Sequence, residues 1–143
     1  MPLVPVARSS FEVGEEATFS RTFTQEDVEG FSRLSGDTNP VHLDEDYARQ
    51  TRFGGRIIHG MLVASLISSV LGTKLPGPGS VYLSQQLSFR APAKVGETLT
   101  ARARVTEWDG TKGRILLATE VVNEGGVQVI VGDAKLVRAS FLK

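Results

Sequence analysis

The chain begins with an alternating segment and then changes to a helical pattern. Over Ala17–Phe23 alanine and phenylalanine alternate with hydroxyl side chains, which predicts a strand. Thr24 precedes three polar or acidic residues and can cap a helix that Gly36 would end. The apolar residues of this helix fall on one stripe: Val28, Phe31 and Leu34. A second short helix is predicted over Asp44–Thr51.

The longest uncharged run lies near the middle of the chain. Ile57–Leu71 is apolar on nearly every side, so a helix here is expected to be surrounded by protein. After it the apolar period changes to two, and glycine-rich turns separate the segments. The strands predicted there cover residues 81–89, 99–106, 114–124 and 127–141. Gly132-Asp133 shifts the apolar phase of the last strand, which predicts a bulge.

These elements predict an α+β fold in a single domain over residues 1–143. About five mostly antiparallel strands would form a curved sheet wrapped around one long buried helix. Such a sheet leaves its edge strands open, and pairing with a second copy of the chain would cover them. We therefore expect a homodimer or a higher homo-oligomer.

Composition narrows the classes of function. Sixteen basic and sixteen acidic side chains cancel, so no basic excess favours nucleic acid as a partner. The chain has no cysteine and two histidines, which excludes thiolate chemistry and disfavours a metal centre. The N-terminal residues lack the continuous apolar stretch of a signal peptide, and the uncharged run is short for a membrane span. We expect a cytoplasmic protein without a membrane partner.

The candidate chemistry lies in the loop from Gly36 to His42. Asp37 and His42 stand at the two ends of a turn constrained by Pro40, so both side chains can face one water molecule. A carboxylate and an imidazole around one water are suited to general acid–base catalysis. Turn chemistry also accounts for these residue types: Asp37 can form an Asx turn, Asn39 is a common turn former, and His42 can be a core residue.

The segment F-S-R-L-S-G-D-T-N-P-V-H-L-D-E-D-Y-A, residues 31–48, resembles the signature of MaoC-like (R)-specific enoyl-CoA hydratases. Two further stretches, I-H-G-M at 58–61 and F-R-A-P-A-K-V-G-E-T-L at 89–99, extend the resemblance to roughly residues 12–142. The family fold is the hotdog, a sheet wrapped around a long helix. That fold agrees with the order of elements predicted independently above.

The resemblance implies a site and a reaction. Asp37 and His42 would be the catalytic dyad that adds water to a trans-2-enoyl-CoA, giving (R)-3-hydroxyacyl-CoA, or that runs the dehydration. We expect Asp37 to be the principal base and His42 to orient the water, although coupled groups need not have separate roles. No separate cofactor is implied, because coenzyme A is part of the substrate. Asn39 would brace the loop beside the substrate.

The opening of the apolar helix adds a third element to this site. The backbone N–H of Gly60 would be free of a helical partner and could form the oxyanion hole; tight helix–sheet packing is the alternative role of this glycine. In the family a serine matching Ser68 lines the active site; alternatively its hydroxyl bonds back to the Ala64 carbonyl. His59 is interpreted as structural, with contact to the substrate as the alternative. Arg90 and Lys94 could contact the phosphates of coenzyme A, but they are interpreted as solvated surface charge.

Three alternatives to this function remain. The same reaction on an acyl-carrier-protein thioester would differ only in the carrier. Thioester hydrolysis occurs on other hotdog proteins, and fold alone does not decide function. A non-catalytic acyl-CoA-binding subunit is the third, but it would be expected to lack Asp37 or His42, and both are present.

Overall fold

A computed structural model describes residues 7–142 of the chain. The expectation about a signal peptide depends on the N-terminal segment, most of which lies outside the described residues. Within residues 7–142 one sheet, one long helix and three shorter helices make up the regular structure, with a 3₁₀ turn, Ala139–Phe141, at the end.

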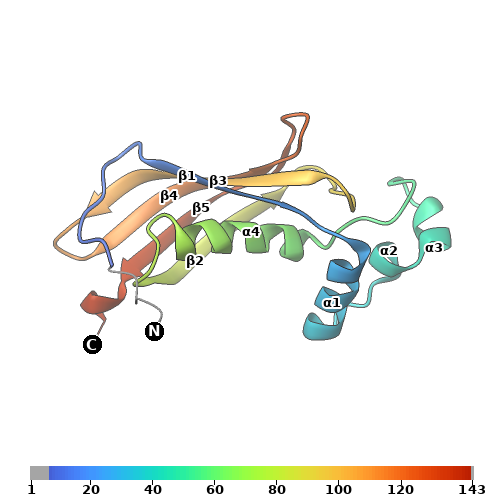
Figure 1. Cartoon of the computed structure of the whole chain (residues 1–143), viewed down its shortest axis with the longest axis horizontal. Helices are drawn as coiled ribbons and strands as arrows, with labels where there is room; N and C mark the ends of the chain where they lie inside the picture. The colour runs from blue at the N-terminus through green and yellow to red at the C-terminus, as the bar shows by residue number, and fades with distance from the viewer. Residues whose placement is uncertain (1–6, 143) are drawn as a thin grey trace, which may run out of the picture.

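The sheet contains five antiparallel strands in the order β1-β3-β4-β5-β2. Their bounds are β1 Glu16–Thr22, β2 Ser80–Phe89, β3 Thr98–Asp109, β4 Arg114–Val122 and β5 Gln128–Arg138. The long helix α4, Gly60–Thr73, runs beneath this sheet (Figure 1). The number of strands, their direction and their arrangement around one helix confirm the predicted fold class.

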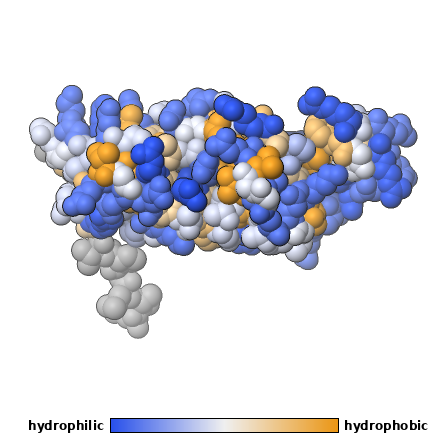
Figure 2. Space-filling view, turned by 90° about the horizontal axis from the view of Figure 1, so that it is seen from above, coloured by the Kyte–Doolittle hydropathy of each residue, from blue (hydrophilic) through white to orange (hydrophobic). Residues whose placement is uncertain are grey.

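The core lies between α4 and the inner face of the sheet. From Leu99 to Val105 in β3 every second side chain points inward and is fully buried, whereas Arg102 and Arg104 between them are exposed. Seen from above the sheet, the surface is mainly hydrophilic with scattered hydrophobic patches (Figure 2). The period-two pattern in the sequence therefore reflects one buried and one solvated sheet face.

The bulge predicted at Gly132-Asp133 is wrong. Both residues pair in continuous register with β2 and with β4, and the register shift in β5 falls at Val129 instead. Gly132 is required for a different reason, because a β-carbon there would come within 1.8 Å of the Gln86 carbonyl oxygen. The glycine thus permits close approach of the edge strand β2.

The apolar helix is not covered on every side in the single chain. It begins at Gly60, later than predicted, and residues 57–59 lead into it without helical structure. Met61, Ser65 and Ser68 recur at helical spacing and form an exposed stripe, with Met61 59% exposed. The expectation that protein surrounds this helix fails here because the sheet covers only its other face.

Three short helices extend beyond the end of the sheet (Figure 1). They are α1 Gln25–Ser35, α2 Pro40–Leu43 and α3 Glu45–Arg49. Thr24 and Asp27 form a capping box at the start of α1, and Gly36 ends it in the left-handed conformation, as predicted. Leu34, the last residue of the apolar stripe predicted for α1, is 89% exposed.

Candidate active site

Local hydrogen bonds fix the loop that carries Asp37. The Ser35 hydroxyl accepts from the Asp37 backbone N–H at 3.1 Å, and one oxygen of the Asp37 carboxylate accepts from the Asn39 N–H at 3.2 Å. The second contact is an Asx turn, so the turn interpretation of Asp37 is confirmed. It leaves the other carboxylate oxygen free, and the side chain is exposed in the single chain.

Asn39 positions the segment that carries His42. Its side-chain oxygen accepts from the Val41 N–H at 3.3 Å and caps α2, with Pro40 as the first helical residue. This short helix was not predicted, although proline directly after a capping asparagine is its sequence signal. It turns His42 inward, so that the imidazole is only 8% exposed.

One hydrogen bond determines which ring nitrogen of His42 is available. Nδ1 lies 2.8 Å from the Ile57 carbonyl oxygen, which can only accept, so Nδ1 carries the proton. In the neutral ring Nε2 therefore presents a lone pair. This is the tautomer that a residue holding or deprotonating water requires.

The two ends of the loop come together as predicted. A carboxylate oxygen of Asp37 and ring nitrogens of His42 and His59 all lie within 4.8 Å of one another. The exposed carboxylate and the buried imidazole form one small polar cluster. That cluster can hold a water molecule between an acid and a base.

His59 is the third residue of this cluster; the sequence predicted a structural residue here but not its contacts with Asp37 and His42. It is 1% exposed, and its ring stacks on that of His42 with 3.9 Å between centroids. Its Nε2–H donates to the Asp37 backbone carbonyl at 3.1 Å, and the Ser32 hydroxyl lies 3.0 Å from the same nitrogen. The sequence signal for this buried polar contact is Ser32, a polar residue one turn after Val28 on the buried face of α1.

Burial lowers the pKa of His59, and the neighbouring His42 ring lowers it further. The hydrogen bond to Asp37 and the charge of its carboxylate act in the opposite direction. Its Nδ1 is buried without a hydrogen-bond partner among the described residues. His59 is therefore held as a neutral imidazole protonated at Nε2.

The stacking also limits what the cluster can bind. The lone pairs of an imidazole lie in the plane of its ring, and the two ring planes are inclined by only 28°. Two stacked rings do not direct their nitrogens at one ion, and Nε2 of His59 is already used as a donor. The geometry suits bound water better than a metal ion.

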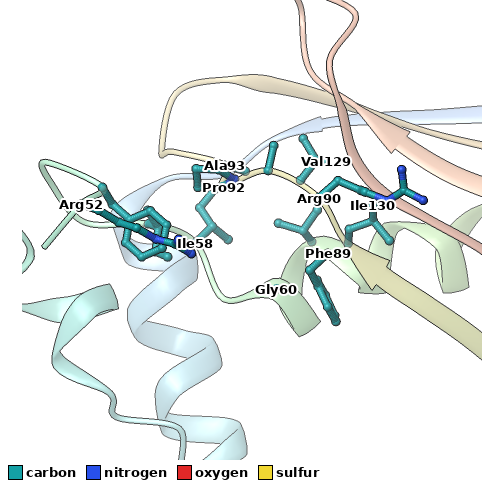
Figure 3. Close-up of a pocket in the computed structure, with 13 residues that line it drawn as sticks. Arg52, Ile58, Gly60, Phe89, Arg90, Pro92, Ala93, Val129 and Ile130 are labelled. Carbon is teal, nitrogen blue, oxygen red and sulfur yellow. The ribbon is translucent and has the colours of Figure 1, made fainter.

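Gly60 is the first residue of α4, directly after His59. Its N–H has no acceptor among the described residues and lies at the positive end of the helix dipole. A pocket of about 300 Å³ reaches this glycine (Figure 3). Its apolar lining includes Ile58, Val63, Phe89 and Ile130. An anionic oxygen can therefore approach the free N–H from an apolar cavity.

Ser68 lies in a separate groove of about 440 Å³ between α4 and β2, which Gly60 does not line, and Ser68 does not line the pocket at Gly60. The alternative of a buried serine bonded to the Ala64 carbonyl is wrong, because Ser68 is exposed and makes no such bond among the described residues. Its predicted place beside the substrate stays a prediction.

The charged residues around the pocket are arginines. Arg90 and Lys94 are exposed, in agreement with the sequence interpretation, and the Lys94 ammonium donates to the Phe53 carbonyl at 3.1 Å. Arg90 nevertheless lines the pocket at Gly60, and Arg52 lies on its opposite side (Figure 3). Neither arginine forms an ion pair within residues 7–142.

The MaoC-like domain model matches residues 9–127. The (R)-specific enoyl-CoA hydratase of Aeromonas caviae is 43% identical over 129 residues, covering 90% of this chain and 96% of that protein. The 3-hydroxybutyryl-CoA dehydratase of Methylorubrum extorquens is 44% identical over 123 residues, covering 86% and 78%. The solved (R)-hydratase of A. caviae superposes with a TM-score of 0.87 at 43% identity, over 90% of this chain and 98% of that one.

The chain therefore belongs to the MaoC-like family and has the hotdog fold. It is an enzyme of the hydro-lyase class that includes these hydratases and dehydratases. No helix in the described part of the chain is long and apolar enough to cross a membrane.

Proposed function

We propose that this enzyme hydrates trans-2-enoyl-CoA to (R)-3-hydroxyacyl-CoA and catalyses the reverse dehydration. The observation that carries the proposal is the polar cluster within 4.8 Å formed by Asp37, His42 and His59, together with the free N–H of Gly60, which follows His59 in the chain. Hydration of an enoyl thioester requires a positioned water, a proton acceptor and a site for the negative charge on the thioester oxygen. The first two functions fit the dyad and the third fits Gly60.

In the proposed reaction one water molecule lies between the Asp37 carboxylate and Nε2 of His42. A proton leaves the water to the dyad while its oxygen bonds to C3 of the substrate. The electron pair of the C2–C3 double bond shifts toward the thioester, which becomes an enolate with its negative charge on the thioester carbonyl oxygen. The dyad then returns a proton to C2, so the sum is addition of one water. Asp37 is the principal base and shuttle in this scheme.

The enolate oxygen is stabilised by the Gly60 N–H and the positive end of α4. A donor aimed at developing charge accounts for roughly 10²–10³ in rate in other enzymes. Glycine at this position also lets the thioester come close to the backbone. All groups required by this scheme belong to the chain or to the substrate, so we propose that no metal and no separate cofactor take part.

The carrier of the acyl group is proposed to be coenzyme A. Arg52 and Arg90 on the two sides of the pocket have no acidic partner within residues 7–142, and guanidinium groups bind phosphates well. An acyl-carrier-protein thioester is the alternative carrier; it has the same phosphopantetheine arm but lacks the further phosphates of the coenzyme A nucleotide. The similar relatives named above are named for coenzyme A substrates.

We further propose that the enzyme acts as a homodimer. Edge strand β2 exposes large apolar side chains, and with the open stripe of α4 it lines the groove that contains Ser68. A second copy on this face would cover the groove and exclude water from a site in which Asp37 is exposed.

Sedimentation should give twice the chain mass, and Leu83→Glu on this face should shift the measured mass toward that of the monomer. A monomeric wild type would contradict the dimer.

The reaction is tested with purified protein and crotonyl-CoA. Hydration removes the enone absorbance without releasing free thiol. Release of thiol would instead indicate a thioesterase, and no reaction over a series of acyl lengths would indicate a binding subunit. The complete Asp37 to His42 segment favours the hydratase over both.

A further inference from the structure

The interactions of His59 connect the two members of the dyad. Through Nε2 it reaches the backbone of Asp37, and through the face of its ring it touches His42. Because Ser32 lies against the same nitrogen, this one side chain joins α1, the Asp37 loop and the start of α4. Its neighbour in sequence, Gly60, supplies the proposed oxyanion donor.

We propose that His59 is a positioning residue that holds the Asp37 carboxylate and the His42 imidazole in register for proton transfer. This inference rests on the proposed hydration reaction. His59 does not touch the reacting atoms in this scheme, since one ring nitrogen is bound to backbone and the other is buried.

Each of the two contacts restricts one dyad member. The Nε2–H to the Asp37 carbonyl fixes the loop at the residue whose carboxylate reacts. For His42, the bond from Nδ1 to Ile57 fixes the edge of the ring, and the stacked His59 ring fixes its face. With edge and face both held, Nε2 of His42 keeps one direction. Small displacements of such groups cost large factors in rate.

The neutral state of His59 suits this role. A charged ring against His42 would oppose the positive charge that His42 gains when it takes a proton from water. Burial favours the neutral ring, and the single proton sits on the nitrogen that faces Asp37. The side chain therefore supports His42 without competing with it for protons.

Two substitutions separate the contacts. His59→Phe keeps a flat ring against His42 but loses the donor to Asp37. His59→Gln keeps an N–H at similar reach but loses the ring. Ser80→Ala is the matched control, because it removes an acceptor from the buried Arg138 at the other end of the molecule.

The first measurement is kcat and KM with crotonyl-CoA. We expect His59→Phe to lower kcat about tenfold or more with KM changed less than about threefold, and His59→Gln to retain more activity. In an Asp37→Asn background His59→Phe should cost less than about twofold, because residues that act as a unit are not additive. Ser80→Ala should lower the melting temperature without lowering kcat.

The second measurement needs no turnover. The chain has two histidines, so each His59 variant leaves His42 as the single imidazole in an NMR spectrum. Loss of the covering ring lets water reach His42, so its Nδ1–H should exchange with solvent faster in His59→Gln than in His59→Phe. Equal exchange rates would contradict the support of His42, and normal kcat in His59→Phe would contradict the support of Asp37. A wild type without hydratase activity would refute the proposed reaction instead, and the NMR comparison would still test the contact.

Discussion

The ring of Phe89 packs against the α-carbon of Gly60, so closely that a β-carbon at position 60 would lie 2.7 Å from ring atom Cε1. Phe89 ends edge strand β2 and Gly60 begins α4, so this contact joins sheet and helix in the lining of the pocket (Figure 3). The glycine thus satisfies a packing requirement and leaves its N–H open to the cavity.

Substitutions at this contact separate packing from catalysis. Gly60→Ala should lower kcat about tenfold or more, because a methyl group obstructs the approach of the thioester oxygen to the N–H. In a Phe89→Ala chain the clash with the ring is gone, yet Gly60→Ala should still lower kcat. Melting curves and crotonyl-CoA kinetics of the four chains provide the test. Full tolerance of alanine in the Phe89→Ala background would assign Gly60 to packing alone.

The pH dependence of stability follows from the buried His59. Its pKa is lowered in the folded chain, so below the ordinary histidine value of 6.5 the unfolded chain binds a proton that the native chain does not. The free energy of unfolding should fall as pH decreases from 6.5, by at most about 1.4 kcal/mol per pH unit from this group. Denaturant titrations should show a smaller fall in His59→Gln. An equal fall in both chains would assign the effect to other groups.

Phosphate binding by the two arginines at the pocket would make KM depend on the carrier of the acyl group. Arg52→Gln and Arg90→Gln together should raise KM for crotonyl-CoA about fivefold or more, because a charged hydrogen bond contributes roughly 1.5–3 kcal/mol. KM for the N-acetylcysteamine thioester, which lacks phosphates, should not change. Arg104→Gln, on the exposed face of β3, is the matched control. Equal effects on the two thioesters would contradict phosphate binding by these arginines.

Local signals in the sequence predicted the elements that depend on neighbouring residues. The start and end of α1 follow from Thr24, Asp27 and Gly36, which act within a few residues of one another. The convergence of Asp37 and His42 was also predictable, because Pro40 and the turn limit the intervening chain. The alternation in the strands identified the buried face of the sheet.

Features that depend on distant contacts were not predictable in the same way. The exposed stripe of α4 was not predictable, because an apolar pattern indicates a buried helix but does not show which of its faces the sheet covers. A glycine in a strand indicates either a bulge or a close strand contact. The sequence therefore predicted the phase shift in β5 at Gly132, three residues from the shift at Val129. The stack of His42 on His59 joins residues 17 positions apart, and only the fold brings them together.

The central claim is that Asp37 and His42 act on one water molecule. The most direct measurement is the turnover of crotonyl-CoA by Asp37→Asn and by His42→Gln, followed by the loss of enone absorbance. Each substitution should lower the rate by at least about 10²-fold, the usual scale for general acid–base groups. Both variants should melt within a few degrees of wild type. Near-normal turnover by either variant would contradict the claim.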